Sequence, residues 1–131
     1  MAQLYSSTIK SHYRNPLNTG KLSVYSHYAE EINPLCGDET KIYLQITNGV
    51  IEDSAHETRG CMICVASASA VSEIARGKKL EEIKKLGVPD LAKLLSVAIS
   101  PARESCATLI LKAISSHRFQ RGPALGGGLS L

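Results

Sequence analysis

The alternation of apolar and polar residues indicates a β-hairpin in the first half of the chain. Residues 41–47, KIYLQIT, carry an aliphatic side chain at every second position, which is the period of a strand with one buried face. The dipeptide Asn48-Gly49 follows, and both residues tolerate the positive φ of a two-residue hairpin turn. Residues 50–60 therefore return as an antiparallel strand, and the strand-forming side chains within 21–32 predict a third strand.

The remainder of the chain has the spacing and end signals of helices. We expect them at residues 4–13, 65–77, 79–87 and 89–99, with a last helix that begins after Ser100-Pro101. The stretch 65–77 is rich in alanine and serine, which allows close packing against a sheet, and Gly77 is placed to cap its end. Strands followed by helices predict an α+β fold, a small three-stranded antiparallel sheet with helices packed on one face.

The length and composition are those of one globular domain. The chain has 131 residues, 44% hydrophobic and 21% charged, so a single core needs no disulfide. We expect one domain over residues 1–120 and a flexible glycine-rich tail over 121–131. No apolar run approaches the roughly 18 residues of a membrane helix. The polar N-terminus lacks a secretory signal, so we expect no membrane association and a cytoplasmic location.

That location changes the interpretation of the four cysteines. Cytoplasmic thiols stay reduced, so cysteines in this small chain are better interpreted as metal ligands or reactive thiols than as disulfides. The net charge of +3 is small and the basic residues are scattered, so we expect no nucleic-acid partner. The candidate chemistry is therefore that of thiols and metals.

Three of the cysteines lie at loops or helix starts. Cys36 is in NPLCGD, a run of turn-forming residues just before a strand, and Asp38 lies two positions further on. Cys61 follows Gly60 at the junction of a strand and a helix, and Cys106 lies in the opening part of the last helix. Three thiols from three such segments can converge at one edge of the sheet.

Other interpretations of the cysteines stay open at this point. Free cysteine is often a core residue, which fits Cys64, one turn into an apolar helix; for Cys106, core and ligand roles are equally open. The CMIC motif at 61–64 also fits a thiol oxidoreductase, but a hairpin precedes it where a βαβ unit is expected. The second Cys-x-x-Cys of a paired zinc knuckle is missing. His56 is either a further site residue or an ordinary strand residue.

Four motifs taken together resemble one protein family. They are HYRNPLNTG, NPLCGDETKIYLQI, GCMICVASASAVSE and ARESCATLILKAI. They are similar, in this order, to the signatures of the U-type iron-sulfur cluster scaffold proteins, the family of IscU, SufU and the NifU N-terminal domain. The similarity covers residues 4–117 and is closest to the IscU branch.

The resemblance implies a function and a set of site residues. Such proteins are scaffolds, not enzymes, that assemble a [2Fe-2S] cluster from iron and from sulfur supplied as a persulfide by a pyridoxal-phosphate-dependent cysteine desulfurase. They then transfer the cluster to apo iron-sulfur client proteins. Carried over by position, the ligands are Cys36, Asp38, Cys61 and Cys106, with Cys106 as sulfur acceptor. A carboxylate among thiolates is an exchangeable ligand, which suits cluster release; a turn-forming role for Asp38 fits the same place.

The sequence departs from the family pattern near the third cysteine. Ser105 stands where the IscU branch has a histidine, which favours Asp38 as the fourth ligand, with Cys64 as a substitute. The segment that the Hsp70-type chaperone recognises in that branch is replaced here by AISPARESC. The zinc-using SufU branch has an extra segment between its second and third cysteines and a lysine before the third, and neither feature is present.

Two further functions are alternatives to the scaffold. In one, the same residues hold zinc, and one thiol relays sulfur from the desulfurase as in SufU. Zinc is also the metal that the scaffold could hold when it has no cluster. In the other, Cys61 and Cys64 form a thiol oxidoreductase. We also expect cluster binding to be linked to formation of a homodimer or to partner docking, because an exposed cluster is open to solvent and oxidants.

Overall fold

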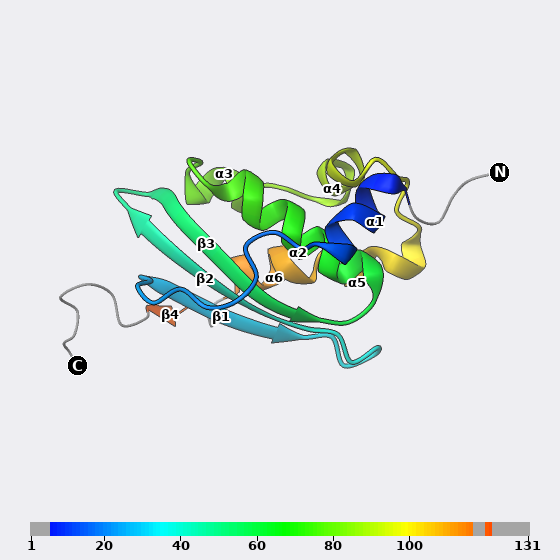
Figure 1. Cartoon of the computed structure of the whole chain (residues 1–131), viewed down its shortest axis with the longest axis horizontal. Helices are drawn as coiled ribbons and strands as arrows, with labels where there is room; N and C mark the ends of the chain where they lie inside the picture. Colours follow the sequence, from blue (N-terminus) through cyan, green and yellow to red (C-terminus); the bar gives the residue numbers. More distant parts are fainter. Residues whose placement is uncertain (1–5, 117–119, 122–131) are drawn as a thin grey trace.

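The computed structural model describes residues 6–116 and 120–121. Its helices are α1 (Ser7–Arg14), α2 (Met62–Ala75), α3 (Leu80–Lys84), α4 (Val88–Leu95), α5 (Glu104–Ala107) and α6 (Leu109–Ser115), with a 3-10 turn, η1 (Pro101–Arg103), before α5. Its strands are β1 (His27–Ile32), β2 (Glu39–Thr47), β3 (Val50–Arg59) and β4 (Gln120–Arg121). The helices lie together on one side of the sheet (Figure 1).

The sheet has the order β3-β2-β1-β4, and neighbouring strands are antiparallel. The predicted α+β fold, with a three-stranded antiparallel sheet of β1, β2 and β3 under helices, is confirmed. The two-residue β4 extends this sheet by pairing with His27 and Tyr28. Of the predicted tail, Arg121 belongs to β4, and residues 122–131 lie outside the described residues.

The hairpin between β2 and β3 forms where the Asn-Gly dipeptide predicts it. Asn48 has φ 53° and Gly49 has φ 80°, the left-handed values that a two-residue hairpin turn requires. Thr47 pairs with Val50 across the turn. This register turns the aliphatic face of β2 towards the helices, with Ile42 fully buried.

The first strand is shorter than the sequence predicts. β1 begins at His27, so residues 21–26 of the expected strand are not part of it. Just before β1, the Ser26 backbone N–H still donates to the Leu44 carbonyl (2.9 Å), whereas the Ile46 N–H donates to the Ser26 Oγ (2.8 Å). The pairing of β2 with β3 shifts register between Gln45 and Ile46 and then continues to the turn.

Two predicted helices end or break earlier than expected. α4 ends at Leu95, not at residue 99, because Ser96 takes a left-handed conformation with φ 55°. The last helix is divided at Thr108 into α5 and α6. The Thr108 Oγ1 donates to the Glu104 carbonyl (2.7 Å), a local side-chain bond that competes with regular helix geometry. The short α5 is therefore a separate element.

α2 is the centre of the core. Eleven of its 14 residues are buried, and it packs against β3, α1, α4, α5 and α6. Its small side chains let these elements approach from several sides, as the alanine- and serine-rich composition predicts. The helix begins at Met62, three residues before the predicted start, and Gly77 has φ 85° just beyond its end, where a cap is expected.

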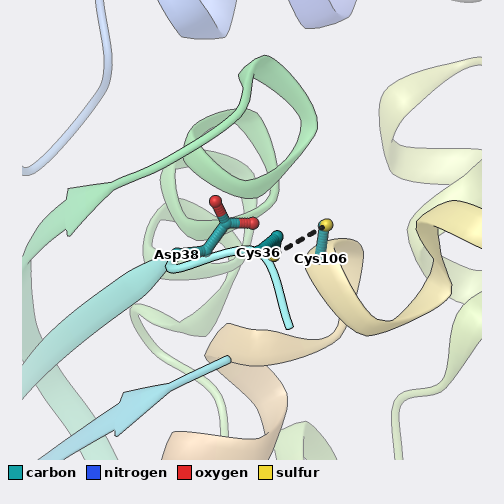
Figure 2. Close-up of side chains that lie close together, drawn as sticks. All are labelled: Cys36, Asp38 and Cys106. Atoms are coloured by element: carbon teal, nitrogen blue, oxygen red, sulfur yellow. Dashed lines mark hydrogen bonds between the residues drawn. The ribbon is translucent and has the colours of Figure 1, made fainter. Parts of the chain in front are cut away.

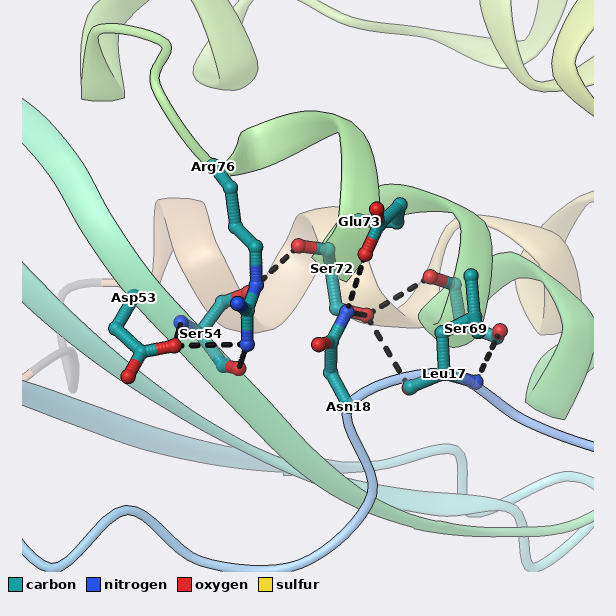
Figure 3. A network of polar contacts seen from close by, with 8 residues as sticks. All are labelled: Leu17, Asn18, Asp53, Ser54, Ser69, Ser72, Glu73 and Arg76. Atoms are coloured by element: carbon teal, nitrogen blue, oxygen red, sulfur yellow. Dashed lines mark hydrogen bonds and ion pairs between the residues drawn. The ribbon is translucent and has the colours of Figure 1, made fainter.

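Serine hydroxyls link the N-terminal segment to α2 and β3 by hydrogen bonds (Figure 3). We call Ser54, Ser69 and Ser72 with their hydrogen-bond partners the serine network. The Ser69 Oγ accepts from the Leu17 N–H (2.8 Å), and the Asn18 side chain donates to the Ser72 Oγ (3.1 Å). The Ser54 Oγ donates to the Ser72 carbonyl (2.6 Å). The network joins three segments that are far apart in the sequence.

Within residues 6–116 and 120–121, we find no helix with the length and apolar character needed to cross a membrane.

Candidate metal centre

The four residues that the sequence singles out meet at one end of the sheet. Cys36 lies in the loop between β1 and β2, and Asp38 directly precedes β2. Cys61 is the N-cap residue of α2, and Cys106 lies in α5. Figure 2 shows the Cys106 side chain reaching from α5 towards Cys36 in the loop. The meeting point is at the strand ends, not along an edge strand.

Their ligand atoms form two close pairs. The Cys36 Sγ, the Cys106 Sγ and a carboxylate oxygen of Asp38 all lie within 4.8 Å of one another. The two sulfur atoms of Cys36 and Cys106 are 3.7 Å apart. The Cys61 Sγ is 3.6 Å from the Asp38 Oδ2. The predicted ligands thus comprise a thiol-thiol pair and a thiol-carboxylate pair at one place.

These separations suit tetrahedral coordination. Two thiolates bound at about 2.3 Å to one ion at the tetrahedral angle lie about 3.8 Å apart, and a thiolate and a carboxylate oxygen about 3.6 Å apart. The observed pairs match both values. Three thiolates and a carboxylate are ligands that both zinc and iron accept. Cys61 is not in the group whose ligand atoms all lie within 4.8 Å of one another, so among the described residues three side chains, Cys36, Asp38 and Cys106, are close enough for one ion. The two pairs fit the two ligands that each iron of a [2Fe-2S] cluster takes.

Asn33 organises the loop, and the sequence reasoning missed this role. Its backbone N–H donates to the Asp38 carbonyl (2.8 Å), and its carbonyl accepts from the Gly37 N–H (2.7 Å). Its side-chain oxygen accepts from the Leu35 N–H (3.1 Å), the bond of an Asx turn. Gly37 has φ 77°, so a residue without a Cβ is needed there. The signal was present in NPLCGD, where asparagine opens the turn.

Asn33 also ties this loop to the helix that carries Cys106. Its side-chain nitrogen donates to the Ser105 Oγ (3.1 Å), across 72 positions of sequence. Ser105 stands where the IscU branch has a histidine, and in this structure it holds the Cys36 loop against α5. No local sequence pattern predicts a hydrogen bond between residues so far apart in the chain. The tie explains how an exposed loop keeps Cys36 near Cys106.

Gly60 makes room for the Asp38 carboxylate. A Cβ at this position would overlap the side chain of Asp38, approaching its Cγ to 2.6 Å, and Gly60 has φ 154°. The next backbone N–H, that of Cys61, donates to the Asp38 Oδ1 (3.2 Å). One carboxylate oxygen is thus held by the start of α2, while the other faces the Cys61 thiol. Asp38 is therefore a positioned side chain rather than a turn former alone.

The carboxyl group of Asp38 favours its ionised form although the residue is only 3% exposed. Burial acts to raise the pKa of its carboxyl, but hydrogen bonds from the thiols of Cys36 and Cys106 and from the backbone and thiol of Cys61 outweigh burial and lower that pKa. The carboxylate is therefore charged at neutral pH. It is ready to bind a cation without losing a proton.

The two thiols of the close pair differ in access. Cys36 is exposed, whereas Cys106 is 7% exposed. Burial, followed by contacts with Asp38, Cys36 and Cys61, raises the pKa of the Cys106 thiol. Solvent and partners therefore reach Cys36 first. Cys106 must lose a proton before it binds a metal or attacks a sulfur donor.

Cys64 and His56 lie outside this cluster of ligand atoms. Cys64 is 2% exposed within the hydrophobic core, and burial raises the pKa of its thiol, as expected for a core cysteine. His56 is buried, and its ring nitrogens contact the Thr58 Oγ1 (2.8 Å) and the Leu17 carbonyl (3.0 Å). A thiol oxidoreductase based on Cys61 and Cys64 gains no support, since the second thiol is neither accessible nor reactive.

Comparison with known families identifies the family of the chain. The family model of the NifU-like N terminal domain matches residues 4–120. The chain belongs to that family. The resemblance carried by the four motifs is therefore confirmed, and it makes this protein a member of the iron-sulfur cluster assembly scaffold family of IscU, SufU and NifU proteins.

Relatives within the NifU-like family bear two kinds of name. The zinc-dependent sulfurtransferase SufU of Bacillus subtilis (strain 168) is 32% identical over 128 residues, covering 85% of this chain and 86% of that protein. The iron-sulfur cluster assembly scaffold protein IscU 1 of Archaeoglobus fulgidus is 32% identical over 111 residues, covering 85% of this chain and 72% of that protein.

A solved structure shares the fold. It is a putative iron-sulfur cluster assembly scaffold protein for the SUF system from Fervidobacterium islandicum AW-1, with a TM-score of 0.73 and 24% identity, covering 84% of this chain and 93% of that one.

Proposed function

We propose that this protein is a non-enzymatic scaffold on which a [2Fe-2S] cluster is assembled and from which it is transferred to apo iron-sulfur client proteins. The observation that carries the proposal is the meeting of three thiols and one ionised carboxylate at the strand ends, as two pairs 3.7 and 3.6 Å apart. Each iron of such a cluster takes two protein ligands. Cys36 with Cys106 supplies one pair, and Cys61 with Asp38 supplies the other.

Asp38 is the ligand that makes release possible. A carboxylate is a harder ligand than a thiolate and is exchanged more readily from iron. Only one of its oxygens is free to face a metal, because the other accepts the Cys61 N–H. A carboxylate held in this way stays close enough to bind again, yet leaves one corner of the cluster open to a client protein's thiol.

Sulfur reaches this site from a pyridoxal-phosphate-dependent cysteine desulfurase, with Cys106 as the acceptor. Cys106 is buried, so the acceptor role requires α5 to open when the partner docks. α5 has only four residues and is set off by the break at Thr108. Leu35, 91% exposed, and Ile32, 60% exposed, offer apolar surface beside Cys36 for such a partner to cover. Docking, or a homodimer of the loaded protein, would shield the cluster in the same way.

A zinc-bound sulfur relay is the second candidate function. It is supported by the kind of donors, thiols and a carboxylate with Cys36, Asp38 and Cys106 within 4.8 Å of one another, and by the name of the Bacillus subtilis relative. In that function Cys36 or Cys106 leaves the zinc to accept sulfur, and no cluster is built. For either function a cytoplasmic location stays a prediction.

Anaerobic reconstitution tests the proposal. The protein is incubated with ferrous iron, cysteine and a cysteine desulfurase, and visible absorption and bound iron and sulfide are measured. The scaffold function predicts a coloured protein with two iron and two sulfide per cluster, and Cys61→Ala loses most of it. A colourless protein that keeps one zinc ion and accelerates sulfur release by the desulfurase would establish the relay instead.

A further inference from the structure

Cys36 and Cys106 form a pair of reduced thiols in near contact. Their sulfur atoms are 3.7 Å apart, and both cysteines are free (Figure 2). One of them is exposed and the other is buried. Two thiols at such a separation can form a disulfide with a small movement of one side chain, and the Asn33 to Ser105 hydrogen bond keeps their two segments together.

Cluster assembly requires reduction of the delivered sulfur, and the thiols of Cys36 and Cys106 are close enough to supply the electrons. A persulfide delivers sulfur in the sulfane state, whereas a cluster contains sulfide, which has two more electrons. We propose that Cys36 and Cys106 act as an internal dithiol reductant that releases sulfide from a persulfide on Cys106. This inference rests on the proposed function, since it requires that sulfur be delivered to Cys106.

The step balances without a further reagent. The Cys36 thiolate attacks the Cys106 Sγ, a new bond forms between these two sulfurs, and the bond from the Cys106 Sγ to the outer sulfur breaks. The outer sulfur leaves with the electron pair and, with the two protons of the Cys36 thiol and the persulfide, forms hydrogen sulfide. The two cysteines are oxidised to a disulfide by two electrons, and the sulfane sulfur is reduced by two. A dithiol reductant must then reopen the disulfide before the next round.

The surroundings favour attack on the inner sulfur. Attack on the outer sulfur would expel a Cys106 thiolate at a buried position that faces the charged Asp38 carboxylate. Attack on the inner sulfur expels hydrosulfide, which is not tethered to the protein and can carry its charge into solvent. A negative charge is costly beside a carboxylate away from water, and inexpensive in solvent. The charge distribution therefore directs the reaction to sulfide rather than to a second persulfide.

Cys36 is better placed for this role than Cys61. The Cys61 thiol points to the Asp38 carboxylate at 3.6 Å, whereas Cys36 makes its sulfur contact with Cys106 itself. Near-contact of the reacting atoms gives an intramolecular thiol a large advantage over one in solution.

Persulfide chemistry without iron tests the inference. The whole 131-residue chain is loaded by a cysteine desulfurase and cysteine under nitrogen, separated from small molecules, and kept without added reductant or metal. Released sulfide is measured by colour reaction, and peptide mass analysis locates persulfides and disulfides. The wild type should release sulfide and gain the Cys36–Cys106 disulfide in a one-to-one ratio. Cys36→Ser should keep its persulfide on Cys106 and release sulfide at least about tenfold more slowly.

Cys64→Ala is the matched control, because it removes a thiol that lies in the core and takes no part in the site. Thermal unfolding of each variant checks that it is folded; Cys36 is exposed, so its replacement leaves the core intact. Equal sulfide release by the wild type and Cys36→Ser, or a disulfide that joins Cys61 to Cys106, would overturn the inference while leaving the scaffold function standing. Absence of a persulfide on Cys106 in Cys36→Ser, together with absence of the Cys36–Cys106 disulfide in the wild type, would overturn both its acceptor role and this step.

Discussion

Two polar clusters contact α2, and they differ in what satisfies their hydrogen bonds. In the serine network, oxygen and nitrogen atoms meet at 2.6 to 3.5 Å, and Leu17 and Ser72 contribute backbone groups (Figure 3). At the candidate metal centre the contacts are sulfur to sulfur and sulfur to carboxylate, at 3.7 and 3.6 Å. Thiols are weak donors and weak acceptors.

This difference distinguishes the serine hydroxyls, which stabilise the fold, from the thiols and carboxylate of the candidate metal centre, which are available to bind a ligand. A buried hydroxyl with strong partners stabilises the protein, and removing it leaves those partners unpaired. Thiols and a carboxylate that contact mainly one another lose little when a cation replaces those contacts. The contrast therefore predicts opposite outcomes for substitutions in the two clusters.

The largest expected effect is on metal affinity. Cys36→Ala removes one of the four proposed ligands and should weaken zinc binding by at least about a hundredfold, since a structural zinc site contributes roughly 10 to 16 kcal/mol over four ligands. Its free energy of unfolding without metal should stay within about 0.5 kcal/mol of the wild type, because Cys36 is exposed. Competition with a chromophoric chelator and urea denaturation measure the two quantities. Unchanged zinc affinity would remove Cys36 from the site.

The pH dependence of metal affinity sharpens the same contrast. The raised pKa of Cys106 keeps its thiol protonated at neutral pH, so metal binding must release that proton. Zinc affinity should therefore rise with pH between 6 and 8, by about tenfold per pH unit for each proton released. Asp38, whose pKa is lowered, is already ionised and adds nothing to this slope. Affinity that is flat over this range would contradict the protonated state of Cys106.

Breaking the serine network should have the opposite effect. Ser69→Ala leaves the Leu17 N–H without its acceptor and should lower the free energy of unfolding by about 1 to 3 kcal/mol, with zinc affinity unchanged. Ser67→Ala is the matched control on the same helix. Ser67 is fully buried, and its hydroxyl has no partner among the residues that the structure describes. Its removal should cost nothing or stabilise the protein, and equal losses in both variants would refute the distinction.

Gly60→Ala tests how the carboxylate is positioned. The new Cβ would push Asp38 aside, so we expect zinc affinity to fall by about tenfold through loss of one well-placed ligand. Gly49→Ala is the control, because Gly49 also has positive φ but a Cβ there meets no atom within 4 Å. It should cost about 1 kcal/mol of stability through backbone strain and leave the metal site unchanged. Unaltered affinity in Gly60→Ala would mean that Asp38 is not a ligand.

The smallest expected effect is that of Ser105→Ala. Loss of its hydrogen bond with Asn33 should cost about 0.5 to 1.5 kcal/mol of stability and widen the range of separations between Cys36 and Cys106. Hydrogen exchange of the loop amides around Leu35 reports the loosening. Exchange rates equal to those of the wild type would show that Ser105 does not hold the loop.

Local patterns in the sequence were enough to predict the three main strands of the sheet and the position of Cys36 in a loop. The alternation of β2 and the Asn48-Gly49 turn each follow from backbone preferences of neighbouring residues, and turn residues around Cys36 display it in a loop. The ends of elements escaped prediction where a side chain bonds the backbone. Where β1 begins, the Ser26 Oγ accepts the Ile46 N–H of β2, and where the last helix breaks, the Thr108 Oγ1 donates to the Glu104 carbonyl.

The organisation of the site was predictable only in part, for a physical reason. Asn33 reaches Ser105 across 72 positions, and Gly60 is needed because Asp38 packs against it. Such contacts depend on how two distant segments dock, which no local propensity encodes. From the sequence, Ser105 marks a position that lacks a ligand, whereas in this structure it accepts a hydrogen bond from Asn33 and holds the Cys36 loop against α5.

Cluster transfer is the most direct test of the scaffold function. The protein is loaded anaerobically, freed of excess iron and sulfide, and mixed with an apo-ferredoxin in the presence of a strong ferrous chelator. The account predicts that the cluster of the wild type reaches the ferredoxin before the chelator takes its iron, and that Asp38→Ala, which lacks the exchangeable ligand, transfers at least about tenfold more slowly. A protein that forms no coloured cluster, or whose iron passes to the chelator while the ferredoxin stays empty, would contradict the claim that it is a scaffold.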